Sequence, residues 1–183
     1  MRHDRKRRPR PPLSAEKLNE LALAYVGRFA TTRARLRTYL SRKVRERGWD
    51  DGPAPDLEAI AERFAVQGYV DDAAYALSKS RSMTGRGYGV RRVDQSLRTA
   101  GIEEQDAAPA REYAKADRVE AAVRFAERRR LGPFASEVAD RKGRERALAT
   151  MIRAGHGFGL ARAIVDLPPG AEINLVELAE NSG

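Results

Sequence analysis

The sequence contains no cysteine, which excludes disulfide bonds, thiolate catalysis and cysteine-ligated metal sites. Its two histidines, His3 and His156, are too few and too far apart in the sequence to form a metal site. No apolar stretch approaches the length of a membrane span, and the basic first residues lack the apolar run of a secretory signal. We therefore expect a cytoplasmic protein without membrane contact.

Aromatic residues make up only 7% of the chain, and runs rich in valine, isoleucine or threonine are few, so strands have little to build on. Alanine, arginine, leucine and glutamate dominate instead, and these residues favour helices. Ser14 stands before a run of apolar residues at helical spacing, as an N-cap does, and a second such run begins near Thr32. The sequence predicts an all-α protein.

Three glycines that end predicted helices are evenly spaced, because Gly48, Gly101 and Gly155 lie 53 and 54 residues apart. An apolar residue stands four positions before each glycine. A period near fifty residues is typical of repeated supersecondary units, although glycine is also a common helix stop. We predict three tandem three-helix repeats. Their ranges are 14–68, 69–116 and 117–166, with a basic disordered arm at 1–13 and an acidic tail at 167–183.

The formal net charge of +9 favours an anionic partner, and nucleic acid is the commonest one. Several arginines lie opposite the apolar faces of their predicted helices, so that repeated helices would form a basic strip. An ordinary solvated helix face is the alternative. Tyr88 is a further candidate for binding, because its ring can stack on a base or pack on a partner. Packing in the core is its favoured role. The candidate binding residues are Arg35, Arg42, Arg45, Arg81, Arg86, Tyr88, Arg91, Arg92 and Arg98.

The adjacent carboxylates Asp71 and Asp72 raise the question of a metal or catalytic site. Neighbouring residues on a helix point about 100° apart, and no Asp, Glu or His follows three or four positions later. Metal sites need such further ligands. We therefore predict that the pair begins a helix, with one aspartate as N-cap and the other in the first turn, facing the helix dipole.

The stretch GRGYG, residues 85–89, resembles a phosphate-binding glycine loop only superficially. A helix precedes it, whereas a dinucleotide-binding loop follows a strand, and the Gly-Lys-Ser/Thr of a P-loop is absent. We interpret the glycines as a turn between helices. The sequence also lacks a nucleophile elbow. We therefore expect a protein that is not an enzyme and needs no cofactor.

Residues 68–102, GYVDDAAYALSKSRSMTGRGYGVRRVDQSLRTAGI, resemble the RecX family of RecA regulators. The resemblance extends more loosely over residues 18–166. Three positions depart from the family pattern, since Val90 replaces a proline, Arg35 a glutamate and Asp94 a basic residue. The matching residues are Gly68, Tyr69, Asp71, Asp72, Tyr75, Ala76, Arg81, Gly87, Tyr88, Gly89, Arg92, Leu97, Gly101 and Ile102.

The resemblance implies an elongated, curved array of three three-helix repeats. It also implies a regulator, taken to be a monomer, that binds RecA and the RecA–single-stranded DNA filament. Such proteins typically inhibit filament assembly, strand exchange and coprotease action, in DNA recombination, DNA repair and the SOS response. They need no cofactor. The candidate arginines would then contact RecA carboxylates or, in direct DNA contact, phosphates.

Two other classes share the basic charge. A helix-turn-helix DNA-binding regulator needs a short turn before a polar recognition helix. The TGRGYG turn is long for that motif, and the repeats would be unexplained. An RNA- or ribosome-associated basic protein is the third class, and it predicts no dependence on RecA.

Overall fold

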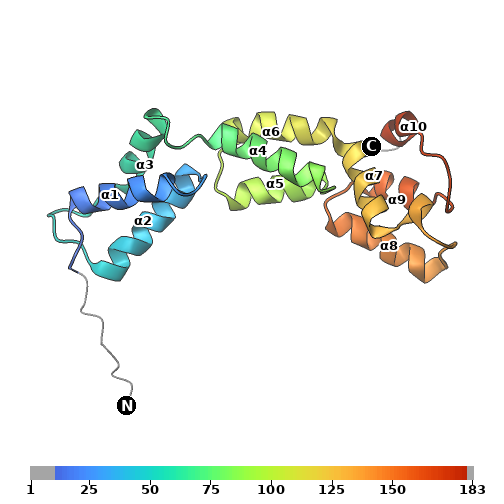
Figure 1. Cartoon of the computed structure of the whole chain (residues 1–183), viewed down its shortest axis with the longest axis horizontal. Helices are drawn as coiled ribbons and strands as arrows, with labels where there is room; N and C mark the ends of the chain where they lie inside the picture. The colour runs from blue at the N-terminus through green and yellow to red at the C-terminus, as the bar shows by residue number, and fades with distance from the viewer. Residues whose placement is uncertain (1–10, 181–183) are drawn as a thin grey trace, which may run out of the picture. The chain divides into compact units, whose positions relative to one another are not determined.

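The computed structural model describes residues 11–180 (Figure 1). Within this range the chain forms ten α-helices, one short 3₁₀-helix and no strand, apart from an isolated bridge between Leu13 and Trp49. The all-α prediction is confirmed. None of the helices in this range has both the length and the apolar character needed to cross a membrane. The predicted disorder of the arm, as far as residues 1–10, lies outside the described residues.

The chain divides into two compact units, Met1–Asp71 and Asp72–Gly183. The first contains α1 (Ala15–Val26), α2 (Arg33–Arg47) and α3 (Leu57–Val66). The second contains α4 (Asp72–Gly85), α5 (Val90–Thr99), α6 (Glu104–Ala116), α7 (Arg118–Arg129), η1 (Gly132–Phe134), α8 (Arg141–Arg153), α9 (Phe158–Val165) and α10 (Leu175–Glu180).

Three polar side chains begin the helices of the first unit. Ser14, Thr32 and Asp56 each accept a hydrogen bond from the backbone N–H three residues later. Each bond satisfies one of the amide donors that a helix start leaves free. Two of these caps, Ser14 and Thr32, stand where the sequence predicts them. The three helices then bury one shared apolar core, which includes Leu18, Ala22, Leu36, Leu40, Ala61 and Phe64.

Leu13 corrects the predicted boundary of the basic arm at residue 13. Its side chain is fully buried in the core of the first unit. Its backbone N–H donates to the carbonyl oxygen of Gly48 at 2.9 Å, and its carbonyl accepts from Asp50 at 3.1 Å. Burial of a leucine side chain is worth about 1.5–3 kcal/mol. The folded unit therefore begins before Ser14. Leu13, which follows a proline-rich stretch, packs the beginning of the chain against the core.

Small residues bring α4 and α6 together in the second unit. The buried Ser80 on α4 donates its hydroxyl to the carbonyl oxygen of Ala110 on α6 at 2.8 Å. Because alanine and serine are small, the two helices can pack closely. Helix α6 also contains a proline in its interior, Pro109. The buried apolar residues of this core are Ala76, Met83, Val93, Leu97, Ala100, Ile102, Ala107, Ala110 and Ala114.

Another apolar core of the second unit lies among α7, α8 and α9, around Phe125, Met151 and Ile164. The buried Leu178 of α10 belongs to this core. The acidic tail predicted at 167–183 therefore contains a packed helix, Leu175–Glu180. The three glutamates of the tail are its only charged residues, whereas Leu178, with Ile173 and Ala179, packs the segment against the core.

The evenly spaced glycines follow α2, α5 and α8. Gly48, Gly101 and Gly155 have φ angles of 82°, 70° and 97°, a region that residues with side chains avoid. The helix ends predicted from these glycines are therefore confirmed. The number of repeats, their boundaries and the curved array stay predictions.

Candidate functional site

The nine candidate binding residues fall into two groups, one in each unit. Three of them, Arg35, Arg42 and Arg45, lie on α2. Arg42 and Arg45 are exposed, whereas Arg35 is partly buried in the first turn of the helix. The other six lie in the second unit, on α4, in the turn after it and on α5. A continuous basic strip through both units stays a prediction.

Arg91 and Arg92 are exposed in the first turn of α5, while Val93 of the same helix is fully buried. That first turn holds no acidic residue. A helix N-terminus carries partial positive charge, so two arginines there leave a local excess of positive charge. An anionic partner would relieve this repulsion. Both arginine side chains are thus exposed, as predicted.

Arg98 is exposed, but its guanidinium lies 2.6 Å from the carboxylate of Asp94 one turn earlier. The same carboxylate lies 2.6 Å from Arg111 on α6, which also contacts Glu104. The side chains of Asp94 and Arg111 are only 20% and 18% exposed. Asp94, the departure from the family pattern, therefore joins α5 to α6 and partly neutralises Arg98.

We expect Asp94→Asn to lower the free energy of unfolding by about 1–2 kcal/mol, because it removes the less exposed of the two carboxylates that contact Arg111, and the one that also contacts Arg98. Urea denaturation followed by circular dichroism measures this change. Glu104→Gln is the matched control, since that carboxylate is highly exposed and should contribute less than about 0.5 kcal/mol. Equal losses from the two variants would contradict a structural role specific to Asp94.

Tyr88 is partly buried and packs against both apolar cores of the second unit. Two arginines cover its ring, with Arg86 at 5.8 Å and Arg128 at 6.0 Å from the centroid. Arg128, on α7, also donates to the carbonyl oxygen of Arg86. The favoured packing role of Tyr88 fits these contacts. Arg128 is not among the residues predicted from the sequence, although it stands in the basic run ERRR at 127–130.

Arg81 is exposed on α4, and its guanidinium lies 5.4 Å from the ring centroid of Tyr113 on α6. This contact is a cation–π interaction, worth about 0.5–1 kcal/mol at an exposed site. Arg81 therefore has a packing contact within the unit.

The GRGYG turn packs against the turn between α8 and α9. Gly89 donates its N–H to the carbonyl of Ala154 at 2.9 Å, and Arg91 donates to Gly155 at 3.1 Å. A Cβ atom at Gly89 would lie 2.4 Å from the Gly155 carbonyl, and one at Gly87 would lie 2.8 Å from the backbone nitrogen of Phe125. The glycines thus permit close backbone contact inside the protein. The predicted loop begins later than expected, because α4 extends through Gly85.

His156 lies in the same contact and is only 2% exposed. Its Nε2 lies 3.1 Å from the carbonyl oxygen of Gly87. A carbonyl only accepts hydrogen bonds, so Nε2 carries the proton of the neutral ring. Burial, opposed by this hydrogen bond, lowers the pKa of His156 to about 4. The histidine is therefore a neutral structural link at neutral pH.

Asp72 is the first residue of α4 and is buried, while the preceding Asp71 is exposed. The helix begins where the sequence predicts, and the capping role of the pair stays a prediction. Among residues 11–180, no group of three or more His, Cys, Asp and Glu side chains is placed to hold a metal ion.

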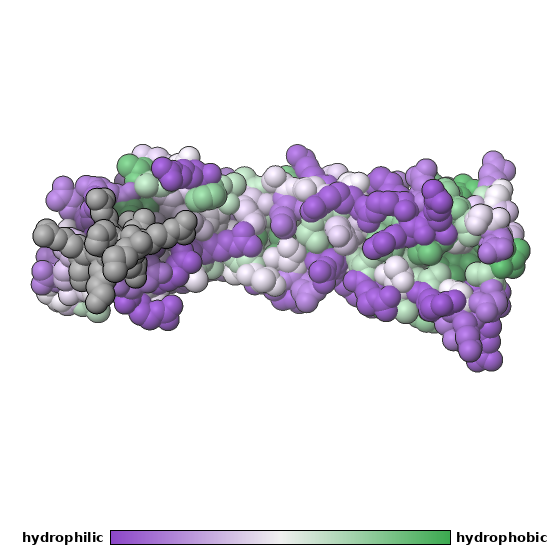
Figure 2. Space-filling view, turned by 60° about the horizontal axis from the view of Figure 1, so that its bottom comes forward, coloured by the Kyte–Doolittle hydropathy of each residue, from purple (hydrophilic) through white to green (hydrophobic). Residues whose placement is uncertain are grey.

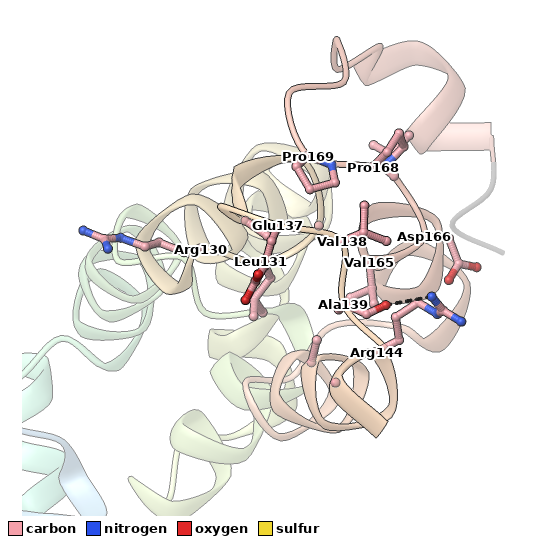
Figure 3. A pocket seen from close by; sticks show the side chains of 15 residues that line it. Arg130, Leu131, Glu137, Val138, Ala139, Arg144, Val165, Asp166, Pro168 and Pro169 are labelled. Carbon is pink, nitrogen blue, oxygen red and sulfur yellow. Dashed lines mark hydrogen bonds between the residues drawn. The ribbon is translucent and has the colours of Figure 1, made fainter. Parts of the chain in front are cut away.

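A pocket of about 180 Å³ lies in the second unit between the segment around η1, the start of α8 and the residues after α9 (Figure 3). Leu131, Val138 and Val165 contribute apolar walls, and Arg144 donates to the carbonyl of Ala139 at 2.9 Å. Arg130 points away from it in Figure 3. None of the candidate binding residues lines this pocket.

Figure 2 shows hydrophilic side chains distributed over the visible face, with smaller apolar areas between them. The described residues thus define an all-helical protein with exposed arginines on several helices.

Comparisons with known proteins identify the family. No sequence profile of a protein family matches the chain. The chain is 34% identical over 177 residues to the "Regulatory protein RecX" of Myxococcus xanthus, covering 89% of this chain and 91% of the relative. It is 31% identical over 151 residues to that of Thermobifida fusca, covering 82% and 80%. The crystal structure of RecX from Lactobacillus salivarius has a TM-score of 0.64 at 21% identity, covering 82% of this chain and 93% of that one. The chain belongs to the RecX family of regulatory proteins, as its sequence motifs indicate.

Proposed function

We propose that this protein binds RecA and the filament that RecA forms on single-stranded DNA, and that it inhibits recombinase and coprotease activity in DNA repair and the SOS response. Similarity to a RecX regulatory protein along 91% of that relative's length carries the proposal. The net charge of +9 and the exposed arginines add surfaces suited to an anionic partner. In this proposal the protein acts as a cytoplasmic monomer, by binding alone and without a cofactor.

A helix-turn-helix regulator is the alternative function. Such a protein places the N-terminal residues of its recognition helix in the major groove of DNA. The N-terminus of α5, which follows the GRGYG turn, instead packs on the turn after α8 through the bonds of Gly89 and Arg91. This packing disfavours the alternative.

The direct test adds the purified protein to RecA on single-stranded DNA and measures ATP hydrolysis. The proposal expects inhibition that deepens as the protein is added in larger amounts. A transcriptional regulator or an RNA-associated protein would leave ATP hydrolysis by RecA unchanged, and that result would exclude the proposal. Stimulation of hydrolysis would retain RecA as the partner and reject inhibition.

Within this function, we expect Arg91→Ala/Arg92→Ala to weaken binding to RecA–DNA filaments by about tenfold while folding stays intact. Each arginine that contacts a phosphate releases counterions, so the salt dependence of single-strand binding should fall by about 0.7 log units per lost contact. If RecA carboxylates are the partners, filament binding falls and binding to naked DNA does not. Fluorescence anisotropy at several salt concentrations measures both affinities.

Arg141→Ala/Lys142→Ala is the matched control. These two residues are also exposed in the first turn of a helix, α8, and their removal changes the net charge equally. Equal weakening by both double variants would show that total charge matters rather than the α5 site.

A further inference from the structure

Phe29 lies between α1 and α2 with 56% of its surface exposed. Its ring packs against the ring of Tyr25, with the two centroids 5.5 Å apart and the ring planes tilted by 48°. Tyr25 in turn stacks on Tyr39 of α2 at 4.2 Å, with an angle of 11° between the rings. The three rings form an aromatic column that begins at the partly buried Tyr39 and ends at the exposed Phe29.

Two cations lie over the Tyr39 end of this aromatic column. The guanidinium of Arg42 and the ammonium of Lys43 each lie 5.7 Å from the centroid of the Tyr39 ring. Arg28, next to Phe29, and Arg45, one turn beyond Arg42, are exposed as well. Two cations therefore contact the column at Tyr39, and two more are exposed nearby in the sequence, Arg28 in the segment between α1 and α2 and Arg45 on α2.

Glu46 is the acidic residue among these cations. It lies 3.6 Å from Arg42 and 2.7 Å from Lys43. A hydrogen bond from Lys43 is the main cause that lowers the pKa of this carboxyl, and the charges of Lys43, Arg42 and Arg45 add to it. Glu46 and Arg42 are about half exposed and Lys43 is partly buried. Ion pairs at an exposed carboxylate contribute little to stability, so phosphates can compete for the two cations. The surface keeps a positive excess.

We infer that the aromatic column binds single-stranded DNA, with a base stacked on Phe29 and the phosphates held by Arg42, Lys43 and their neighbours. Proteins that bind single strands without sequence preference combine exposed aromatic rings with a basic groove in this way. A protein partner would need an apolar cavity to receive Phe29 and carboxylates for the cations, whereas a single strand supplies bases and phosphates at regular spacing. The choice of DNA over RNA rests on the proposed function.

The experiment compares two fluorescent probes of equal charge, a thymidine 20-mer and the same phosphate chain with abasic sites throughout. Full-length protein should bind the thymidine strand about tenfold more tightly, because base stacking adds to phosphate contact. Phe29→Leu should abolish that preference, while Phe29→Trp should retain it. Glu46→Gln should tighten binding of both probes equally, because it releases two cations without changing the rings.

Equal affinity of the wild-type protein for both probes would overturn the inference, as would an unchanged base preference in Phe29→Leu. Circular dichroism of each variant checks the fold, and the exposure of Phe29 makes its replacement compatible with folding. If Phe29→Leu weakens binding to DNA-free RecA but not to either probe, the column is a protein contact and the inference fails. ATP hydrolysis by RecA is measured separately. If the protein inhibits this hydrolysis but binds both probes with equal affinity, the inference is overturned and the proposed function is retained.

Discussion

Gly89→Ala is expected to lower the free energy of unfolding of the second unit by about 3 kcal/mol. The new Cβ would lie 2.4 Å from the carbonyl of Gly155 and 2.5 Å from the nitrogen of His156. These are backbone atoms, so no side-chain rotation relieves the overlap. Separation of the two turns would also break the 2.9 Å bond from Gly89 to Ala154. Urea denaturation followed by far-ultraviolet circular dichroism measures the loss.

Gly85→Ala is the control for this substitution. It adds the same methyl group four residues earlier, at the end of α4, where nothing lies within 4 Å of the new atom. Alanine favours a helix over glycine, so this variant should be unchanged or more stable by up to about 1 kcal/mol. If Gly89→Ala denatures at the same urea concentration as Gly85→Ala, the close contact of the two turns does not stabilise the unit.

Helix starts and stops were predictable because they depend on local chemistry. A hydroxyl at Ser14 or Thr32 accepts a hydrogen bond from an amide three residues away, and the glycine after α2, α5 or α8 adopts a conformation that other residues avoid. The apolar spacing identifies buried residues such as Leu36 and Leu97 for the same local reason.

Contacts between distant segments were not predictable from such patterns. The sequence indicates that residues 85–89 turn, but not that Gly89 meets Gly155 or that His156 bonds to Gly87. Asp94 similarly reads as an isolated acidic residue until α6 brings Arg111 beside it. Leu13 follows a basic, proline-rich stretch and Leu178 lies between two glutamates, so the charge pattern predicts an arm and a tail there and does not reveal that both side chains are buried.

The candidate site was predictable in part for a related reason. Helical geometry places Arg91 and Arg92 outside once Val93 is inside, and both are exposed. The same geometry gives no information on what an outward arginine meets. Arg98 meets Asp94 and Arg81 meets Tyr113, so exposure alone does not distinguish a binding arginine from one that stabilises the fold.

Acidification from pH 6.5 to about 4 is expected to lower the free energy of unfolding by up to about 3 kcal/mol through His156 alone. The folded pKa of about 4 lies below the ordinary value of 6.5, so the unfolded chain binds the proton first. The stabilisation is therefore complete above pH 6.5 and is lost as the pH falls toward 4.

The measurement is a series of urea denaturations between pH 7 and pH 4, on the wild-type protein and on His156→Gln. The glutamine amide can donate the same bond to Gly87 but does not titrate in this range. Carboxylates titrate near the acidic end in both proteins, so the difference between the two pH curves isolates the histidine. We expect His156→Gln to lose about 3 kcal/mol less than the wild type across this interval. Parallel curves would mean that the ring of His156 accepts a proton as easily in the folded protein as in the unfolded chain.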